Sequence, residues 1–430
     1  MNHVRHLRCL ICGRTYSPDE ADYVCPLHGD EGILDVEYDY VALRARISPQ
    51  SLRSNPDPTI WRYRALLPVR SDSIVPPLAV GGTPLYRADR LGAKLGLRSL
   101  WVKDDGRQPT ASFKDRASAI AVVKAQERGD QIITTASTGN AAAALAGLCA
   151  SVGMRNVIFV PESAPAAKVA QLLVFGSTVL LVRGTYDDAF ELCLEAAKSF
   201  GWYNRNTGYN PYMTEGKKTA AYEICEQLTA DLAPDPSPGR RGEWSAPDCV
   251  FVSVGDGCII GGLHKGLKDL HALGWISRMP RLIGVQAAGS AALHDAWRDG
   301  TDALAMQPIE AHTVADSISA GLPRDRIKAL AAVRETHGAY ITVTDEEILA
   351  AIPALARGCG VFAEPAGAAA YAGLIKAVAA RLVSEDERIV VVATGSGLKD
   401  IASARRAVGE PLVVDRDLGD VTRKLHGMSA

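Results

Sequence analysis

Short apolar runs rich in β-branched residues alternate with helical runs along most of this 430-residue chain. This alternation is typical of βαβ units, in which parallel strands form a sheet and helices cover its faces. The expected strands span 99–103, 131–134, 156–160, 178–182, 249–254, 281–286, 339–343 and 388–393. The sequence therefore predicts an α/β fold built on parallel sheets.

Three of the junctions between an expected strand and the next helix carry polar groups that suit an anionic ligand. They read Thr134-Thr-Ala-Ser-Thr-Gly-Asn140, Val254-Gly-Asp-Gly-Cys-Ile259 and Thr394-Gly-Ser-Gly-Leu-Lys399. A helix N-terminus binds phosphate or carboxylate groups through its free backbone N–H groups and its dipole. Taken alone, the junction at 134–140 is better explained by ordinary helix capping, because Ser, Thr and Asn are favoured at N-caps, and a lone glycine-rich turn is weak evidence.

Lys114 lies at a further junction between a loop and a helix, within Ala111-Ser-Phe-Lys-Asp-Arg116. The positive end of the helix dipole disfavours a cation there, and burial would lower the lysine pKa further. A neutral amine is what Schiff-base chemistry requires. The alternative is a solvated lysine at the start of a helix, and the three junctions described above argue against it.

Together these motifs resemble the threonine synthases, a family within the pyridoxal-phosphate enzymes of fold type II (the tryptophan synthase β-subunit superfamily). Two further segments carry the resemblance: Val80-Gly-Gly-Thr-Pro-Leu-Tyr86 and Asn210-Pro-Tyr-Met-Thr-Glu-Gly-Lys-Lys-Thr219. The match extends over roughly residues 60–405. It implies two three-layer domains with parallel sheets, and a cofactor in the cleft between them.

The resemblance also implies roles for individual residues. Lys114 would hold pyridoxal 5′-phosphate covalently and then act as a base or acid, while Phe113 would flank the cofactor ring. Asn140 would bind the phenolic oxygen, and Thr394 would face the pyridine nitrogen. The turn expected to bind the 5′-phosphate comprises Gly255, Asp256, Gly257, Cys258 and Ile259.

The substrate is expected to be a small amino acid. Its carboxylate would bind to Ser137, Thr138, Gly139 and Asn140. The carboxylate of Asp256 would have to point away from the cofactor phosphate, because like charges repel. Glu364 has two interpretations: it lies near the cofactor ring, or it is a helix-start carboxylate that the dipole favours.

One position departs from the family pattern. In threonine synthases that resemble this chain, an arginine at the position of Met213 commonly binds the substrate phosphate. A thioether cannot hold a dianion. Either Lys217, Lys218 or Arg205 replaces that arginine, or the substrate has no phosphate at this place.

The implied reaction is the elimination of phosphate from O-phosphohomoserine followed by addition of water, which gives threonine. The alternatives keep the cofactor and change the substrate. One is a β-replacement on a phosphoserine-like amino acid, resembling cysteate synthase, and another is deamination of serine or threonine. A non-enzymatic alternative is a zinc-ribbon binding module attached to a degenerate enzyme body, and the intact set of Lys114, Asn140 and Thr394 argues against it.

Four residues near the N-terminus have the spacing of a metal site: Cys9, Cys12, Cys25 and His28 form Cys-x2-Cys-x12-Cys-x2-His. Three thiolates and one imidazole suit tetrahedral zinc, and a closed set of four ligands is structural rather than catalytic. A short segment without a core also needs such a staple. The alternative is a set of reduced, metal-free cysteines.

The composition argues against nucleic-acid-binding and membrane-spanning functions. The net charge of −2 gives no indication of nucleic-acid binding. No apolar stretch reaches the roughly 18 residues needed to span a bilayer, and no apolar signal sequence is evident. We therefore expect a cytoplasmic location. We also expect a homodimer. The expected segments are a zinc-ribbon-like segment (1–35), a connecting arm with a helix near 60–67 (36–75), a large cofactor-binding domain (76–118 and 206–410), a small domain (119–205) and a C-terminal tail (411–430).

Overall fold

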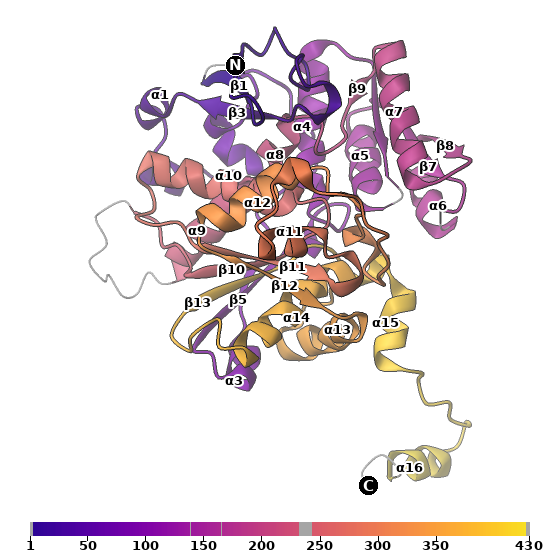
Figure 1. The fold of residues 1–430 in the computed structure, drawn as a ribbon. Helices are drawn as coiled ribbons and strands as arrows, with labels where there is room; N and C mark the ends of the chain where they lie inside the picture. The colour runs from indigo at the N-terminus through magenta and orange to yellow at the C-terminus, as the bar shows by residue number, and fades with distance from the viewer. Residues whose placement is uncertain (1–2, 138, 165, 232–242, 427–430) are drawn as a thin grey trace.

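The computed structural model describes residues 3–137, 139–164, 166–231 and 243–426. It contains two sheets of parallel strands, each covered by helices on both faces, and a small antiparallel sheet near the N-terminus (Figure 1). No helix within these ranges is long and apolar enough to cross a membrane. The sequence at 233–247 is rich in Pro, Gly and Arg, which predicts a surface loop, and residues 233–242 of it lie outside the described part of the chain.

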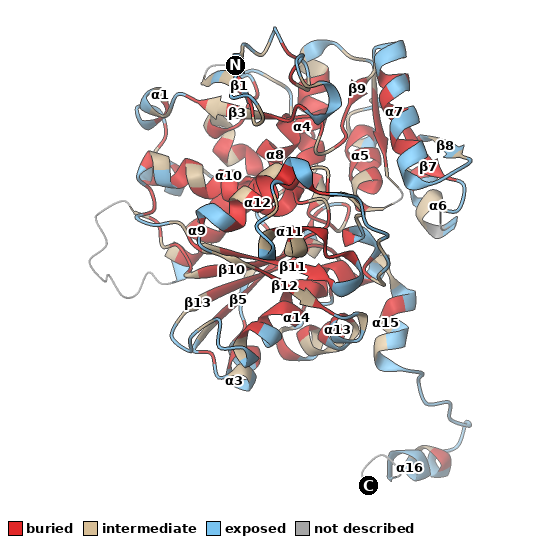
Figure 2. Ribbon diagram, in the orientation of Figure 1, coloured by how far each residue is buried: buried red, intermediate tan, exposed pale blue. Residues whose placement is uncertain are grey.

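The larger sheet has the strand order β12-β11-β10-β13-β5-β4 and is parallel except for the edge strand β4. Its strands are β4 (Leu85–Arg87), β5 (Ser99–Asp104), β10 (Cys249–Ser253), β11 (Arg281–Ala287), β12 (Ala339–Val343) and β13 (Arg388–Ala393). The central strands are buried on both faces, which explains their nearly continuous runs of apolar residues (Figure 2).

Helices cover both faces of this larger sheet. In Figure 1 one layer lies below the sheet and the other above it. The lower layer contains α3 (Asp89–Leu95), α13 (Asp345–Cys359) and α14 (Pro365–Ala379). The upper layer contains α9 (Thr219–Asp231), α10 (Cys258–Leu273) and α12 (Arg326–Glu335). Alternate residues of one strand serve the two layers, since Val250 packs into the upper core and Phe251 into the lower one.

The smaller sheet is fully parallel, in the order β8-β7-β6-β9. Its strands are β6 (Ile132–Ala136), β7 (Arg155–Pro161), β8 (Thr178–Val182) and β9 (Tyr203–Asn204). The helices around it are α4 (Lys114–Arg128), α5 (Asn140–Ser151), α6 (Ala166–Val174) and α7 (Tyr186–Phe200). The strand predictions for this region are accurate to within two residues, because each strand is a short apolar run bounded by turn residues.

The N-terminal sheet consists of β1 (Val4–Cys9), β2 (Thr15–Tyr16) and β3 (Leu34–Tyr38). The N-terminal segment packs against both larger units, which are the two parallel sheets with their covering helices. Lys265 of α10 donates a 2.6 Å hydrogen bond to the Val36 carbonyl, and Lys198 of α7 lies 3.0 Å from an Asp30 carboxylate oxygen. Ile60–Leu66, where a helix is expected, forms a 3-10 helix.

The C-terminal region is peripheral, as its charged sequence predicts. Helix α15 (Ile401–Val408) lies on the surface, and α16 (Leu418–His426) extends away from the body of the molecule (Figures 1 and 2). Apolar side chains in this arm are largely exposed: Val413 and Leu418 are each 79% exposed.

Candidate active site

The predicted site residues follow the carboxyl ends of strands, where ligands bind in open α/β sheets. The turn containing Thr394 follows β13, and the glycine turn at 255–259 follows the neighbouring strand β10. Backbone hydrogen bonds connect the Lys114 loop to the Thr394 turn. The N–H of Phe113 donates to the Thr394 carbonyl at 2.8 Å, and the N–H of Ser396 donates to the Ala111 carbonyl at 3.0 Å.

Lys114 is the first residue of α4 and is half-buried. Burial lowers the pKa of its amine, and the nearby charge of Arg205 lowers the pKa further. Within the described chain the amine has no hydrogen bond or ion pair. Phe113 is fully buried, and its ring lies under the guanidinium of Arg116 at 5.4 Å. The arrangement favours a neutral, nucleophilic amine at the junction.

Asn140 lies on a helix beside the smaller sheet and Glu364 precedes a helix beside the larger sheet, and the two meet at the boundary between these units, here called the seam. Asn140 begins α5, and its side-chain amide donates a 2.7 Å hydrogen bond to the Glu364 carboxylate. Glu364 is the N-cap of α14 but makes no capping hydrogen bond with its side chain. Burial raises the pKa of Glu364. Its contact with Asn140 therefore favours a role in orienting that amide over simple helix capping.

The glycine turn leads directly into α10, the longest helix near the site. Gly257 is the N-cap with φ of 87°, a backbone conformation that favours glycine. The free N–H groups of the first turn of α10 make this end suitable for a phosphate. The carboxylate of Asp256 accepts a hydrogen bond from the backbone N–H of Arg324 at 3.3 Å. Burial raises the pKa of the Cys258 thiol, which keeps it uncharged.

The expected substrate-carboxylate turn lies at the carboxyl end of β6. The hydroxyl of Ser137 accepts a 3.2 Å hydrogen bond from the N–H of Gly139. Thr138 lies outside the described residues. Ala136 and Thr135 are anchored by Asn206, whose side-chain oxygen accepts from both at 2.9 Å. The turn is therefore supported by side chains from the neighbouring loop.

A cavity of about 430 Å³ opens at this seam and is lined by both Asn140 and Glu364. Lys168 of α6 and Asp316 form an ion pair at its rim, and Lys399 contributes a second cation to its wall. Sequence analysis did not identify these three residues. The pair has no sequence signal, because its partners are 148 positions apart. Lys399 belongs to the Thr394 motif, so its place after a glycine turn could have marked it.

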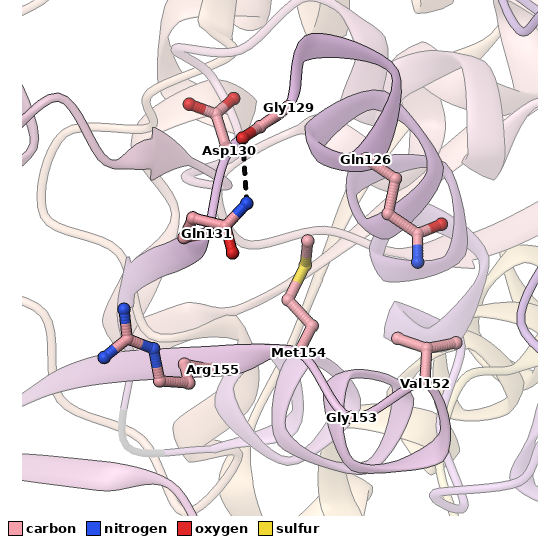
Figure 3. A pocket seen from close by; sticks show the side chains of 8 residues that line it. All are labelled: Gln126, Gly129, Asp130, Gln131, Val152, Gly153, Met154 and Arg155. Atoms are coloured by element: carbon pink, nitrogen blue, oxygen red, sulfur yellow. Dashed lines mark hydrogen bonds between the residues drawn. The ribbon is translucent and has the colours of Figure 1, made fainter.

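A second pocket of about 460 Å³ lies on the small unit, among Gln126, Gly129, Gln131, Met154 and neighbouring residues (Figure 3). None of the predicted site residues lines it. It is at the C-terminal end of α4, about 20 Å along the helix from Lys114. The chemistry-bearing residues therefore gather at the seam and not in this pocket.

The three cations proposed to replace an arginine at position 213 have different surroundings. Met213 itself is fully buried in the apolar core. Lys218 forms ion pairs with Glu215 at 2.6 Å and with Asp269 at 2.8 Å. Arg205 and Lys217 instead lie together, since both donate hydrogen bonds to the hydroxyl of Thr207.

The N-terminal cysteines and histidine converge as their spacing predicts. The ligand atoms of Cys9, Cys12, Cys25 and His28 all lie within 4.8 Å of one another. The sulfurs of Cys12 and Cys25 are 4.0 Å apart, close to the roughly 3.8 Å expected between two thiolates on one tetrahedral zinc. Although burial alone would raise it, hydrogen bonds from Tyr16 and His28 lower the pKa of Cys25 to about 6. The cluster therefore fits a metal ion.

Comparisons with known proteins agree with this geometry. The family model for pyridoxal-phosphate dependent enzymes matches residues 77–395. Threonine synthase of Methanocaldococcus jannaschii is 38% identical over 97% of this chain and 98% of its own length. Threonine synthase of Mycobacterium tuberculosis is 35% identical over 85% of this chain and 95% of its own.

Among solved structures, a similar fold occurs in the processed form of threonine deaminase isoform 2 from Solanum lycopersicum. The TM-score is 0.62 with 23% identity, over 76% of this chain and 87% of that one. At this identity the likeness concerns the fold alone. The family model and the threonine synthase relatives carry the assignment: this chain belongs to the pyridoxal-phosphate dependent enzymes of fold type II, and within them to the threonine synthase family.

Proposed function

We propose that this chain converts O-phosphohomoserine and water into threonine and phosphate. The observation that carries this proposal is the 38% identity to a threonine synthase over nearly the whole of both chains. The junctions at Lys114, Asn140 and Thr394 support it, because they present an amine, an amide and a hydroxyl at one seam. In the overall reaction the Cγ–O bond breaks and phosphate leaves with the bonding electrons, one proton moves from Cβ to Cγ, and water supplies the hydroxyl at Cβ and a proton to the released phosphate.

The residues of the seam fit pyridoxal 5′-phosphate. Asn140 and Thr394 can hydrogen-bond to the polar groups of the cofactor ring. The hydroxyl of Ser112 is buried without a hydrogen-bond partner in the described chain. When bound, the cofactor supplies an electron sink for the carbanion at the substrate Cα. In this proposal the helix start at Gly255, Asp256, Gly257, Cys258 and Ile259 binds the 5′-phosphate.

Lys114 holds the cofactor and moves a proton at the substrate Cα. Its lowered pKa suits this role, because a neutral amine is present at a lower pH than for an exposed lysine. Asn140, held by Glu364, binds the phenolic oxygen, and Thr394 presents a hydroxyl to the pyridine nitrogen. A hydroxyl does not stabilise a protonated ring as a carboxylate would, which favours elimination over transamination.

The substrate carboxylate binds to the turn formed by Ser137, Thr138, Gly139 and Asn140. This turn opens α5, so its backbone N–H groups and the helix dipole favour an anion. The cavity at the seam is lined by Gly139 and Asn140 and gives the amino acid access to this turn.

We also propose that Cys9, Cys12, Cys25 and His28 bind one structural zinc ion. All four ligand atoms converge, and no ligand position remains for a substrate. The metal would fix β1 to the turn after Cys25. The module it stabilises contacts both larger units, through Lys265 and Lys198.

We further propose that the protein is a homodimer. The exposed apolar side chains of the C-terminal arm support this assignment, because an isolated arm would leave them in water. Light scattering of the purified protein tests it: a mass near twice 45.7 kDa is expected, and a mass of a single chain would contradict it.

A substrate screen on the purified protein tests the reaction. Phosphate, keto acids and amino acids are measured together after incubation with O-phosphohomoserine, phosphoserine with sulfite, serine or threonine. Equal amounts of phosphate and threonine from O-phosphohomoserine are expected. Release of a keto acid from threonine or serine would indicate deamination, and a sulfonated amino acid would indicate a cysteate synthase-like β-replacement.

A further inference from the structure

Helix α8 (Tyr212–Lys217) lies between the two helices whose N-termini form the site. Gly216 lets it approach α4, since a Cβ there would meet the Arg116 carbonyl at 2.0 Å. On α10, Gly262 allows the same close contact, since a Cβ there would lie 2.5 Å from the Cβ of Lys217. These two glycines hold Lys217 at the seam, within reach of the start of each helix.

Lys217 is fully buried and is not neutralised by a carboxylate. Its ammonium donates to the hydroxyl of Thr207 at 3.2 Å, and no ion pair joins it to any carboxylate of the described residues. The titratable groups that face it are Lys114 on α4, Arg205 after β9, Cys258 on α10 and Asp325 before α12. Burial raises the pKa of Asp325, so that carboxyl is a weak source of countercharge.

Arg205 is the second buried cation of this group. Its Nε donates to the Ser118 hydroxyl at 3.1 Å, and its Nη1 donates to the Thr207 hydroxyl at 3.0 Å. Its Nη2 is buried with no hydrogen-bond partner in the described chain. Ser118 is one helical turn beyond Lys114, so the two residues share a face of α4. The guanidinium is therefore held close to the amine with a donor left unused.

Two buried basic groups that share one hydroxyl and have no ion pair are unfavourable in their charged forms unless an anion binds between them. A planar guanidinium and an ammonium are the usual ligands of phosphate. We propose that Arg205, Lys217 and Thr207 form a buried subsite for the phosphate group of a phosphorylated amino acid. This inference rests on the proposed function and names the residues that select its substrate.

The geometry of α8 explains why a cation at 217 can serve in place of one at 213. Met213 and Lys217 are four residues apart, so they lie on the same face of the helix one turn from each other. Lys218 is turned away toward Glu215 and Asp269 and is already neutralised. Of the three candidate cations, the two that remain available for a phosphate are therefore Lys217 and Arg205.

Two phosphate groups could use these cations, the substrate's and the cofactor's own. The helix start at Gly257 already offers backbone N–H groups to the cofactor phosphate. Arg205 is fixed to Ser118 of α4, one helical turn from Lys114, where the substrate reacts, and it also faces Cys258 at the start of α10. The contact with α4 favours the substrate's phosphate, and the experiment below separates the two sources.

The test uses the holoenzyme with Lys217→Gln, Arg205→Gln and Arg205→Lys. Lys198→Gln serves as a matched control, because Lys198 lies on the surface and pairs with Asp30. Three quantities are measured for each: KM for O-phosphohomoserine, Kd for inorganic phosphate by calorimetry, and cofactor content after dialysis. The two Gln variants are expected to raise KM and Kd by about 10- to 100-fold while the cofactor is retained. Arg205→Lys should recover part of this loss, and the control should match the unmodified protein.

Unchanged KM and Kd in both Gln variants would overturn the proposal. Loss of cofactor from the variants, with no separate change in phosphate Kd once the cofactor is restored, would also overturn it, because the cations would then hold the cofactor's phosphate. Failure of the proposed function is recognised separately: the unmodified protein would form no threonine from O-phosphohomoserine. In that case the Kd for inorganic phosphate still decides whether the subsite exists.

Discussion

Lys217 and Lys218 are adjacent in the chain and both fully buried, yet they lie in regions of opposite charge balance. Lys218 lies between two carboxylates, at 2.6 and 2.8 Å, and over the ring of Tyr38 at 4.0 Å. Lys217 has a single hydroxyl partner at 3.2 Å, and the basic groups of Lys114 and Arg205 face it together with the carboxyl of Asp325, whose pKa is raised by burial. The same stretch of chain thus places Lys218 in a network of ion pairs and Lys217 in a cluster of basic groups without ion pairs.

The difference separates two uses of a buried charge. A fully paired ion contributes to the folded structure, because removing one partner leaves the other charge uncompensated. A buried ion without a partner lowers the free energy of unfolding. Groups of this kind cluster at functional sites, where a ligand supplies the missing charge. By this criterion the Lys218 network is structural, and the cluster of Lys114, Arg205 and Lys217 is the reactive part of the molecule.

The largest effect is expected at Lys114. Lys114→Ala removes the amine that holds the cofactor and moves the proton, so activity should fall at least about 1,000-fold. In this variant the visible absorption of the bound cofactor should disappear or become removable by dialysis, while the far-UV circular dichroism, which reports secondary structure, stays unchanged. In the unmodified protein, borohydride reduction followed by peptide mapping should locate the cofactor on Lys114. An adduct on any other lysine would remove Lys114 from the reactive cluster.

The second prediction compares the stabilities of variants at the two lysines. Lys218→Met leaves Glu215 buried without its ion pair and Asp269 with only the more distant Lys265, at 3.8 Å, so the free energy of unfolding should fall by about 3–5 kcal/mol. Lys217→Met removes a desolvated amine that has no ion pair, so the free energy of unfolding of this variant should be unchanged or higher. Equilibrium urea unfolding of the two variants, made in the same background, measures both. Equal destabilisation by the two changes would show that both lysines are structural.

The third prediction concerns a variant in which the cation is moved from position 217 to position 213 of α8. In the double variant Met213→Arg, Lys217→Gln, a cation is restored one helical turn away on the same face. It should recover about tenfold of the affinity for O-phosphohomoserine that Lys217→Gln alone loses. Steady-state KM values of the single and double variants give the comparison. No recovery in a stably folded double variant would mean that position 213 does not face the phosphate.

The smallest effect is expected at the metal cluster. Cys12→Ser should lose zinc, while kcat/KM per folded molecule stays within about threefold, because the cluster is remote from the chemistry. Cys359→Ser, at a cysteine outside the cluster, is the matched control and should keep one zinc per chain. Metal analysis and assays on the same samples provide both quantities. Absence of zinc in the unmodified protein from zinc-replete medium would exclude the metal.

Local patterns predict much of the fold. Thr178–Val182 and Ala339–Val343 have the predicted bounds, because their apolar runs end at turn residues. The edge strand Leu85–Arg87 was missed, since it is short and its pairing depends on a distant partner. The strands of the antiparallel N-terminal sheet were not predicted either; the cysteine spacing indicated only a zinc-ribbon-like segment there.

The candidate site is predicted less completely. Sequence identifies Lys114, Asn140 and Thr394 by their junctions, and their roles stay predictions. The pairing of Asn140 with Glu364 is a tertiary contact that no local pattern encodes. Nor can sequence distinguish Lys217 from Lys218, because the distinction arises from Asp269 on another helix.

Proton uptake on phosphate binding tests the central claim most directly. Burial lowers the pKa of Lys217 to about 7, so at pH 8 its amine is mostly neutral in the free enzyme. A bound dianion favours the charged form and raises this pKa, so binding must take up a proton and weaken as the pH rises above 7.

Calorimetric titration of the holoenzyme with inorganic phosphate at pH 8, in two buffers of different ionisation enthalpy, measures this uptake. Net proton uptake is expected in the unmodified protein and in Lys198→Gln, and almost none in Lys217→Gln. Phosphate binding without proton uptake, or uptake that persists in Lys217→Gln, would contradict the account.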